Sequence, residues 1–372
     1  MIKVLLDGKI YEIQSHGGIN RYFNELLSHL VKQEADIEIV FYWPRLTLGA
    51  APSGPGITFI KECNLRPARV FSRISKRVDL GRLRAARPQI FHSTYYNQPY
   101  WSGLKRVVTV YDFIDENTLD TMSGNSLDFH NVKRSVIECA DAIVAISHAT
   151  KADILKYSNA AADKISVIYP GVSGGFINLS FVQAEIDGFC DRRNIKGPYW
   201  LFIGRRRLYK NFGTVLRAWA RMPKTCDTFL VAVGPDQGLE SWQIDFLIKN
   251  RLENRFILLC GVDDRDLALA YSGALGFIFP SLSEGFGIPL LEAMKCGAPI
   301  IASDIPVFHE VAADAALFFD PHDDEELASV MCRLLNDEGL CERLRVAGRV
   351  RACLFSWSKS ACELAQVYRS LV

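Results

Sequence analysis

The sequence predicts an α/β protein built from two doubly wound, Rossmann-like units. Short apolar runs alternate with longer segments of helical period along all 372 residues, a pattern typical of parallel sheets with helices on both faces. The chain is also longer than the roughly 250–300 residues at which single cores stop growing. We therefore expect two units that face a central cleft, with ligands bound at the carboxyl ends of the strands.

The predicted elements follow in order along the chain. Strands are expected at 2–6, 37–42, 57–61, 89–93, 107–111, 142–146 and 165–169, and then at 199–203, 228–233, 255–260, 275–279, 299–302 and 315–319. Helices are expected at 20–33, 126–140, 148–156, 211–221, 240–251, 264–273 and 324–335, and residues 341–372 are helical in pattern. The Pro170-Gly171 turn and the irregular sequence after it suggest a domain boundary. We expect an N-terminal unit at 1–175, a linker at 176–197, a second unit at 198–355 and a C-terminal helix at 356–372 that crosses back to the first unit.

Composition and charge exclude several classes of protein. Lys and Arg total 43 against 42 for Asp and Glu, so the chain lacks the basic excess of a dedicated nucleic-acid binder. No apolar run approaches the ~20 residues that span a bilayer, and Asp7 comes too early for a signal peptide. The ten cysteines include no Cys-x-x-Cys pair. The sequence therefore favours the reducing cytoplasm and predicts neither a zinc site nor a disulfide framework.

One stretch, residues 66–87, departs from this neutrality with eight Lys or Arg and a single acid, Asp79. Val70, Ile74 and Val78 recur every four residues, which predicts a basic amphipathic helix. Two interpretations stay open. The apolar stripe packs on its own domain, or this face meets an anionic membrane surface or a polyanionic acceptor.

The segment 277–297 carries the strongest chemical signal. A buried strand ends at Pro280, and a helix begins near Pro289 after the loop Glu284-Gly285-Phe286-Gly287-Ile288. Glycines let the backbone approach a ligand, and the start of a helix binds anions. With Glu284 before the helix and Glu292 inside it, the segment suits a nucleotide sugar, although acids in a first turn are also common as caps and surface residues.

A second cluster, 204–211, follows the predicted strand 199–203 and reads Gly-Arg-Arg-Arg-Leu-Tyr-Lys-Asn. Cations at the carboxyl end of a strand are suited to a leaving diphosphate, with Arg as a bidentate partner and Lys as a point charge. The alternative is a solvated basic loop.

These clusters, in this order, resemble the family-4 glycosyltransferases of the GT-B fold. Glu284 and Glu292 are similar to that family's pair of glutamates, and Arg205 and Lys210 to its Arg and Lys. Several further segments fall in family order, so that the resemblance covers nearly the whole chain: 17–22, 91–92, 109–112, 145–147, 169–172, 233–235 and 298–321.

The resemblance implies a role for each matching residue. Arg205 and Lys210 would neutralise the diphosphate. Glu284 and the backbone of 285–287 would hold the donor sugar, and Glu292 the ribose. Gly17 and Gly18 would allow the first unit to approach the donor phosphates. We therefore expect the catalytic set Arg205, Lys210, Glu284 and Asp112, and a donor-binding set of Gly17, Gly18, Gly285, Phe286, Gly287, Ile288 and Glu292.

The acceptor side departs from the family at one position. Tyr111 stands where the family commonly has a histidine, and a phenol with an ordinary pKa of ~10 donates a hydrogen bond but is a poor base near neutral pH. Asp112 is a candidate for orienting the acceptor or a turn residue at the end of a strand. His92 and His16 are further acceptor-side candidates, with a structural histidine as the alternative for each.

The resemblance implies a retaining, metal-independent hexosyltransferase that needs no cofactor. The Asp264-Arg265-Asp266 motif opens a predicted helix, where acids are common, so we predict no metal ligands. We expect a nucleotide-sugar donor, with GDP-mannose first, and a glycan or lipid-linked glycan acceptor in polysaccharide or lipopolysaccharide assembly. The predicted location is cytoplasmic, peripheral to the inner face of the membrane. The alternatives are a GT-B nucleotide-sugar epimerase and a catalytically silent nucleotide-sugar-binding protein.

Overall fold

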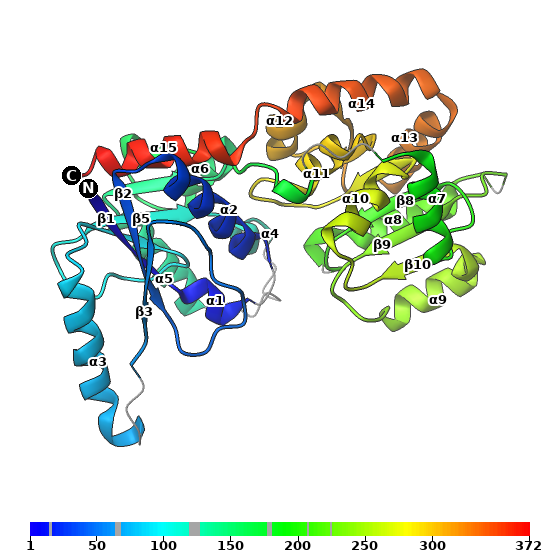
Figure 1. Cartoon of the computed structure of the whole chain (residues 1–372). Coiled ribbons are helices and arrows are strands. Elements are labelled where there is room, and N and C mark those ends of the chain that lie inside the picture. The colour runs from blue at the N-terminus through cyan, green and yellow to red at the C-terminus, as the bar shows by residue number, and fades with distance from the viewer. Residues whose placement is uncertain (15–16, 64–67, 119–126, 177–180, 207, 224) are drawn as a thin grey trace. The chain divides into compact units, whose positions relative to one another are not determined.

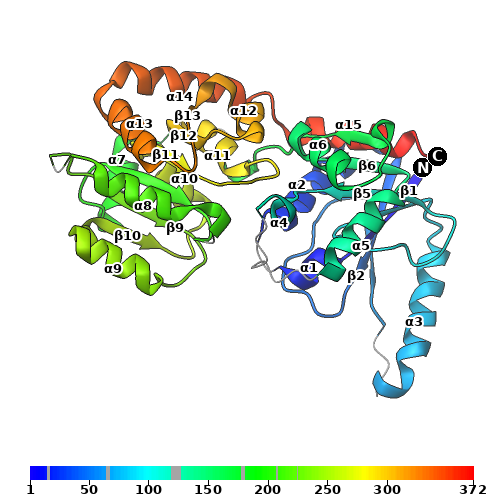
Figure 2. The same ribbon diagram turned by 180° about the vertical axis from the view of Figure 1, so that it is seen from behind.

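A computed structural model describes the chain except for residues 15–16, 64–67, 119–126, 177–180, 207 and 224 (Figures 1 and 2). Contacts between residues divide the chain into two compact units. Unit 1 contains Met1–Phe113, Thr121–Gly171 and Ser356–Val372, and unit 2 contains Ile114–Asp120 and Val172–Phe355.

Unit 1 is built on a seven-stranded sheet in the order β3-β2-β1-β4-β5-β6-β7, in which every pair of neighbouring strands is parallel. The strands are β1 Ile2–Asp7, β2 Ile37–Trp43, β3 Ile57–Lys61, β4 Ile90–Ser93, β5 Lys105–Val110, β6 Ala142–Ala145 and β7 Ile165–Val167. The main helices are α1 Lys9–Ile13, α2 Gly18–Gln33, α3 Ala68–Ala85, α5 Leu127–Glu138, α6 His148–Tyr157 and α15 Trp357–Arg369. The continuous apolar strands are buried on both faces, as β6 shows with four buried residues in a row.

Unit 2 repeats this architecture with a six-stranded parallel sheet in the order β10-β9-β8-β11-β12-β13. Its strands are β8 Tyr199–Ile203, β9 Phe229–Val233, β10 Phe256–Leu259, β11 Gly276–Phe279, β12 Ile300–Ser303 and β13 Leu317–Phe319. Its helices are α4 Ile114–Thr118, α7 Gln183–Arg192, α8 Phe212–Arg221, α9 Ser241–Asn250, α10 Asp264–Ser272, α11 Ile288–Cys296, α12 Pro306–Ala312, α13 Asp324–Asn336 and α14 Glu338–Ala352. The two parallel sheets confirm the predicted fold class.

The C-terminal helix α15 belongs to unit 1 and packs along α2. Tyr368 is fully buried in unit 1, and Arg369 forms ion pairs with Asp36 at 2.5 Å and Glu34 at 2.6 Å. An added Cβ at Gly171 would lie 2.2 Å from the backbone nitrogen of Trp357. The chain therefore has room for α15 only because a glycine stands at position 171.

Part of the range 176–197, which the sequence suggests to be an irregular linker, is instead the helix α7. At its start the Glu185 side chain accepts a hydrogen bond from the backbone nitrogen of Val182 at 3.2 Å, which satisfies one backbone donor at this end of the helix. Phe189 is fully buried, and α7 packs on α10 of unit 2. Phe189 is the one buried residue of the helix, so the periodic signal is weak, which explains why the sequence pattern did not indicate this helix.

Candidate active site

Two loops of unit 2 meet where the neighbouring strands β8 and β11 end. Lys210 follows β8 and Glu284 follows β11, and Lys210 Nζ forms an ion pair with Glu284 Oε1 at 2.5 Å. Their side chains are only 14% and 11% exposed. Each charge is largely shielded from water and is paired with the other. Removing either residue would therefore leave the other charge without its partner.

Asn211 fixes the positions of these loops. Its side-chain amide donates to the backbone oxygens of Pro280 at 3.1 Å and Pro321 at 2.7 Å, so it joins the loop after β8 to the loops after β11 and β13. Asn211 has a left-handed backbone (φ 53°) at the N-cap of α8, a conformation that asparagine tolerates better than most residues. The sequence pattern gave it no separate role, although an asparagine at the start of a predicted helix is a cap signal.

The helix α11 begins at the same edge of the sheet. Gly287 is its N-cap with φ 96°, and an added Cβ would lie 3.2 Å from the rings of Phe279 and Phe308. A glycine is therefore required both by the backbone conformation and by the close packing. The dipole at the start of this helix favours an anion, as the sequence predicts for the start of the helix after the loop 285–288.

Glu292 lies inside α11 and is only 4% exposed, so it is not the surface residue that the alternative interpretation requires. The Tyr271 hydroxyl donates to Glu292 Oε2 at 3.1 Å. This bond orients the carboxylate. The sequence offered no signal for Tyr271, because a buried tyrosine in an amphipathic helix looks like an ordinary core residue.

The cationic cluster after β8 divides into an exposed and a buried arginine. Arg205 is exposed, whereas the Arg206 side chain is 3% exposed. Arg206 Nη2 donates to the backbone oxygens of Asp236 at 3.1 Å and Gly238 at 2.5 Å, which fixes the loop after β9. The sequence did not separate the role of Arg206 from those of its neighbours.

Three buried polar atoms among the described residues of this region lack a hydrogen-bond partner: Arg206 Nη1, Ser281 Oγ and Ser303 Oγ. All three residues lie at or just beyond the carboxyl ends of β8, β11 and β12. Buried polar groups are rarely left unsatisfied in native proteins. Such groups at the edge where Rossmann-like sheets bind ligands are consistent with a polar ligand.

In unit 1, Gly17 and Gly18 lie at the start of α2 and are exposed. An added Cβ at Gly18 would meet no atom within 4 Å, so nothing within the chain requires a glycine there. His16 lies outside the described residues.

His92 and Tyr111 are both buried in unit 1. His92 is completely buried, with Nδ1 2.6 Å from the Tyr368 hydroxyl and Nε2 2.9 Å from the Thr109 hydroxyl, and burial lowers its pKa to about 3. The Tyr111 hydroxyl donates to the backbone oxygen of Thr94 at 3.2 Å, and burial raises its pKa well above the ordinary value. Both side chains are therefore uncharged near neutral pH and hydrogen-bonded within unit 1, which corresponds to the structural alternative for His92.

The lowered pKa of His92 predicts a pH dependence of stability. The unfolded histidine binds a proton below pH ~6.5, whereas the folded one remains neutral down to a pKa of about 3. The free energy of unfolding should therefore decrease as the pH falls through this window, by up to ~1.4 kcal/mol per pH unit. Urea unfolding at pH 7.5, 6 and 5 should show a shallower slope for His92→Gln than for the wild type. Equal slopes would contradict this.

Asp112 is the second residue after β5 and is half-buried, and its backbone oxygen accepts a hydrogen bond from Lys133 Nζ at 2.8 Å. In the described part of the chain, no three His, Cys, Asp or Glu side chains are grouped so that they could hold a metal ion. None of the helices in that part is both long and apolar enough to cross a bilayer.

Comparisons with solved structures define the class of protein. Sucrose-phosphate synthase from Thermosynechococcus elongatus superposes with a TM-score of 0.79 at 20% identity, covering 100% of this chain and 99% of the other. WaaG, a glycosyltransferase involved in lipopolysaccharide biosynthesis, gives a TM-score of 0.73 at 15% identity over 98% and 99% of the two chains. These likenesses show the fold, that of the GT-B glycosyltransferases.

Comparisons of sequence then give the family. Residues 16–173 match the family described as Glycosyltransferase Family 4, and residues 191–351 match Glycosyl transferases group 1. The chain belongs to the glycosyltransferases that combine these two domains, as the resemblance predicted. It is also 30% identical over 244 residues to the serotype-specific mannosyltransferase WbdA of Escherichia coli, and 28% identical over 295 residues to the O-antigen chain mannosyltransferase B of the same organism. The matches cover 64% and 78% of this chain, 30% of WbdA and 76% of the second relative.

Proposed function

We propose that this glycosyltransferase transfers a hexose, with retention of configuration, from a nucleoside-diphosphate donor to a glycan or lipid-linked glycan. The Lys210–Glu284 ion pair beside the start of α11 carries the proposal, because it combines a cation, a carboxylate and an anion-binding helix at one edge of the sheet. The two mannosyltransferase relatives support mannose as the transferred sugar and O-antigen or related polysaccharide assembly as the process. We propose GDP-mannose as the first donor to test.

In the proposed reaction, the bond between the sugar C1 and the donor phosphate oxygen breaks while the acceptor hydroxyl oxygen bonds to C1 on the same face. The acceptor proton passes to the leaving phosphate oxygen, so the products are the glycosylated acceptor and a nucleoside diphosphate. Arg205 and Lys210 stabilise the charge that develops on the diphosphate. The scheme needs neither a cofactor nor a metal ion.

The remaining residues position the substrates. Glu284 and the backbone of 285–287 hold the sugar hydroxyls, and the start of α11 binds the phosphate. Glu292, held by Tyr271, accepts the ribose hydroxyls. Asp112 orients the acceptor. These groups contribute by positioning the substrates rather than by forming covalent bonds.

The proposal is tested by incubating the protein with GDP-mannose, UDP-glucose or other nucleotide sugars, with and without a membrane extract that contains lipid-linked glycans. We expect nucleoside diphosphate release that depends on the extract, and an anomeric signal in the product with the configuration of the donor. An inverted product would contradict retention. An epimerised nucleotide sugar formed without an acceptor would instead identify an epimerase.

Gly18→Ala tests the approach of the donor to the start of α2. An added Cβ meets no atom of the chain, so the melting temperature should stay within about 1 °C, since exposed substitutions of this kind change stability little. If the donor phosphates approach this backbone, the donor KM should rise at least about tenfold. An unchanged KM would remove Gly18 from the donor site.

We also propose that the protein works at the cytoplasmic face of a membrane and contacts it through α3. All ten cysteines are free thiols, which favours a reducing compartment. Ile74 and Val78 lie one turn apart on α3 and are 47% and 41% exposed. They are therefore not packed on unit 1, which supports the membrane interpretation over an internal one. The Val70 side chain lies outside the described residues.

Other residues of α3 attach the helix to unit 1 and leave one side of it exposed. Asp79 is 4% exposed and accepts a hydrogen bond from the Tyr42 hydroxyl at 3.0 Å, and Leu83 is buried. These residues attach the helix to unit 1. Lys76 and Arg77 are exposed beside Ile74 and Val78, so the exposed side of α3 over 74–78 combines apolar and cationic side chains, as interfacial helices do.

The double variant Ile74→Ser/Val78→Ser is expected to reduce cosedimentation with vesicles of anionic phospholipid at least about fivefold. Inserting an aliphatic side chain of this size into the apolar part of a membrane contributes at most ~1.5–3 kcal/mol, and the variant loses two such contributions. Binding of the wild type should also weaken with salt. As a control, Val346→Ser changes an exposed valine of unit 2 and should leave vesicle binding unchanged. Equal loss in both variants would contradict a role specific to α3.

A further inference from the structure

Unit 1 contains a hollow at the point where the order of its strands in the sheet reverses. The chain runs from β1 to β2 and β3 on one side, whereas β4 pairs with β1 on the other side. Open parallel sheets bind ligands at the carboxyl ends of their strands at such a switch point. Here a hollow of about 60 Å³ opens, called the β1–β4 hollow below and lined by Asp7, Gly8, Lys9, Glu12, Tyr42, Pro44, Glu62, Asn97 and Tyr100. A larger one of about 260 Å³ adjoins it and shares Pro44 and Glu62.

Asp7 forms the rigid floor of the β1–β4 hollow. It is 1% exposed and accepts hydrogen bonds from the backbone nitrogen of Thr94 at 2.9 Å, from the Thr94 hydroxyl, and from the Ser93 hydroxyl at 3.3 Å. Burial raises the pKa of this carboxyl, although the bonds from Thr94 partly offset the rise. These bonds fix the end of β1 against the end of β4, so the floor is set before any ligand arrives.

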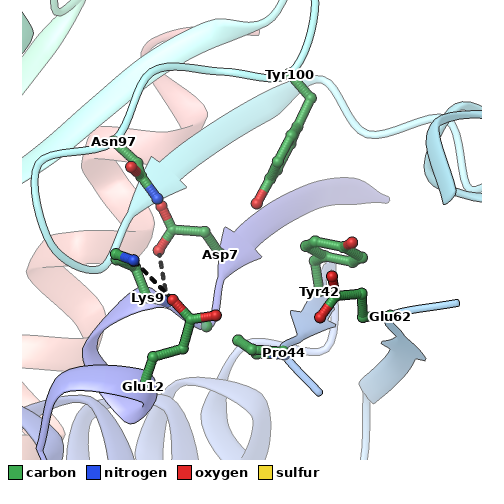
Figure 3. A pocket seen from close by; sticks show the side chains of 9 residues that line it. Asp7, Lys9, Glu12, Tyr42, Pro44, Glu62, Asn97 and Tyr100 are labelled. Atoms are coloured by element: carbon green, nitrogen blue, oxygen red, sulfur yellow. Dashed lines mark hydrogen bonds and ion pairs between the residues drawn. The ribbon is translucent and has the colours of Figure 1, made fainter. Parts of the chain in front are cut away.

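Two tyrosines form the wall. Their rings pack edge to face, with the centroids of Tyr42 and Tyr100 5.4 Å apart. The Tyr42 hydroxyl is held by Asp79 on α3, which fixes that ring. Figure 3 shows the Tyr100 hydroxyl pointing into the space between Asp7 and Tyr42. Burial and the neighbouring carboxylates raise the pKa of Tyr100, so its hydroxyl keeps its proton and can donate it in a hydrogen bond.

The rim sets the charge of the ligand. Of the residues that line the β1–β4 hollow, Glu12 and Glu62 are acids at its rim and Lys9 is a cation, whose Nζ is paired with Glu12 Oε2 at 2.8 Å. Arg45 and Lys61 line the adjoining hollow. Glu62 Oε2 accepts a hydrogen bond from the backbone nitrogen of Arg45 at 3.0 Å. An ionised carboxylate only accepts hydrogen bonds, so it suits hydroxyl donors and repels phosphate or another carboxylate.

We propose that the β1–β4 hollow is a subsite for an uncharged sugar ring of the acceptor glycan. Sugar hydroxyls donate to Glu12 and Glu62, the Tyr100 hydroxyl donates to a sugar oxygen, and the aromatic wall contacts the C–H face of the ring. The inference rests on the proposed function, because only a transferase needs an acceptor, but it assigns a binding site and a charge class that the proposed function leaves open.

Saturation-transfer NMR on the full chain tests this with free mannose, glucose and N-acetylglucosamine, and with glucuronic acid as a charged counterpart. We expect neutral sugars to give signals that Glu62→Gln and Tyr100→Phe each reduce at least threefold, and glucuronic acid to give little signal. Asp163→Asn is the matched control, since it removes an exposed carboxylate in a 3-10 helix before β7, at the opposite edge of the same sheet. It should leave the signals unchanged.

Three outcomes would overturn the inference: no signal from any neutral sugar, equal signals from glucuronic acid, or neutral-sugar signals that neither hollow variant reduces. The variants alter an exposed carboxylate and one hydroxyl, so melting temperatures should stay near that of the wild type, and either variant alone suffices if the other unfolds. Binding of GDP and UDP is measured on the same samples. If the wild type binds a nucleotide but the sugar signals do not depend on the hollow, only the inference fails. If the wild type binds neither nucleotide, the proposed function is contradicted.

Discussion

Lys210→Ala is expected to lower kcat/KM at least ~100-fold, because removing one group that stabilises developing charge typically costs 10²–10³ in rate. Lys210 Nζ lies 2.5 Å from Glu284 and is 14% exposed, so water cannot fully replace the lost cation. The measurement is nucleoside diphosphate release at saturating and limiting donor. The effect should appear mainly in kcat if Lys210 acts on the leaving group rather than on ground-state binding.

Two controls separate chemistry from folding. Lys249→Ala removes an exposed lysine on α9 of the same unit and should leave kcat/KM within about twofold. Lys210→Ala also leaves Glu284 as a shielded carboxylate without its partner, which is destabilising in its own right. The double variant Lys210→Ala/Glu284→Gln should therefore melt closer to the wild type while remaining inactive. If the double variant regains activity along with its stability, Lys210 has no catalytic role.

Tyr368→Ala is expected to lower the free energy of unfolding of unit 1 by ~3–5 kcal/mol, the usual cost of removing a fully buried aromatic ring. Tyr368 is 0% exposed, and its hydroxyl is 2.6 Å from His92 Nδ1. The change therefore creates a cavity and also leaves a buried histidine nitrogen without its partner. Urea unfolding followed by tryptophan fluorescence measures the loss.

Two further variants of α15 separate the contribution of the Tyr368 ring from that of its hydroxyl and from that of an exposed residue. Tyr368→Phe keeps the ring and should cost ~1–3 kcal/mol, because a buried hydrogen-bonding group loses its partner. Lys359→Ala alters an exposed residue of α15 and should change stability by less than ~0.5 kcal/mol. A wild-type value for Tyr368→Ala would show that α15 is not a structural part of unit 1.

The central strands were predictable because their residues are buried on both faces. Runs such as Ile2–Asp7 and Tyr199–Ile203 are nearly continuous in apolar residues, and this signal does not depend on distant parts of the chain. The short helix α1 and the helix α7 have few buried residues, Ile10 and Tyr11 in α1 and Phe189 in α7. Their stability comes from tertiary contacts that no local pattern encodes.

The site was predictable for a related reason. Glu284 and Lys210 lie in loops that follow strongly predicted strands, and neighbouring parallel strands bring such loops together. Tyr271, Arg206 and the hydrogen bonds of Asn211 were not predictable, because each partner lies 20 or more residues away along the chain. The burial of Tyr111 and His92 also depends on packing against α2 and α15. The roles of the site residues stay predictions until they are measured.

The most direct test of the central claim is calorimetric titration of nucleoside diphosphates into the wild type and into Glu292→Ala. Glu292 is 4% exposed and held by Tyr271 at the proposed ribose position. We expect one nucleoside diphosphate, with GDP first, to bind the wild type at a 1:1 ratio and to bind the variant at least ~10-fold more weakly. If no nucleoside diphosphate binds the wild type, or if the variant binds as tightly, then unit 2 does not hold the donor as proposed.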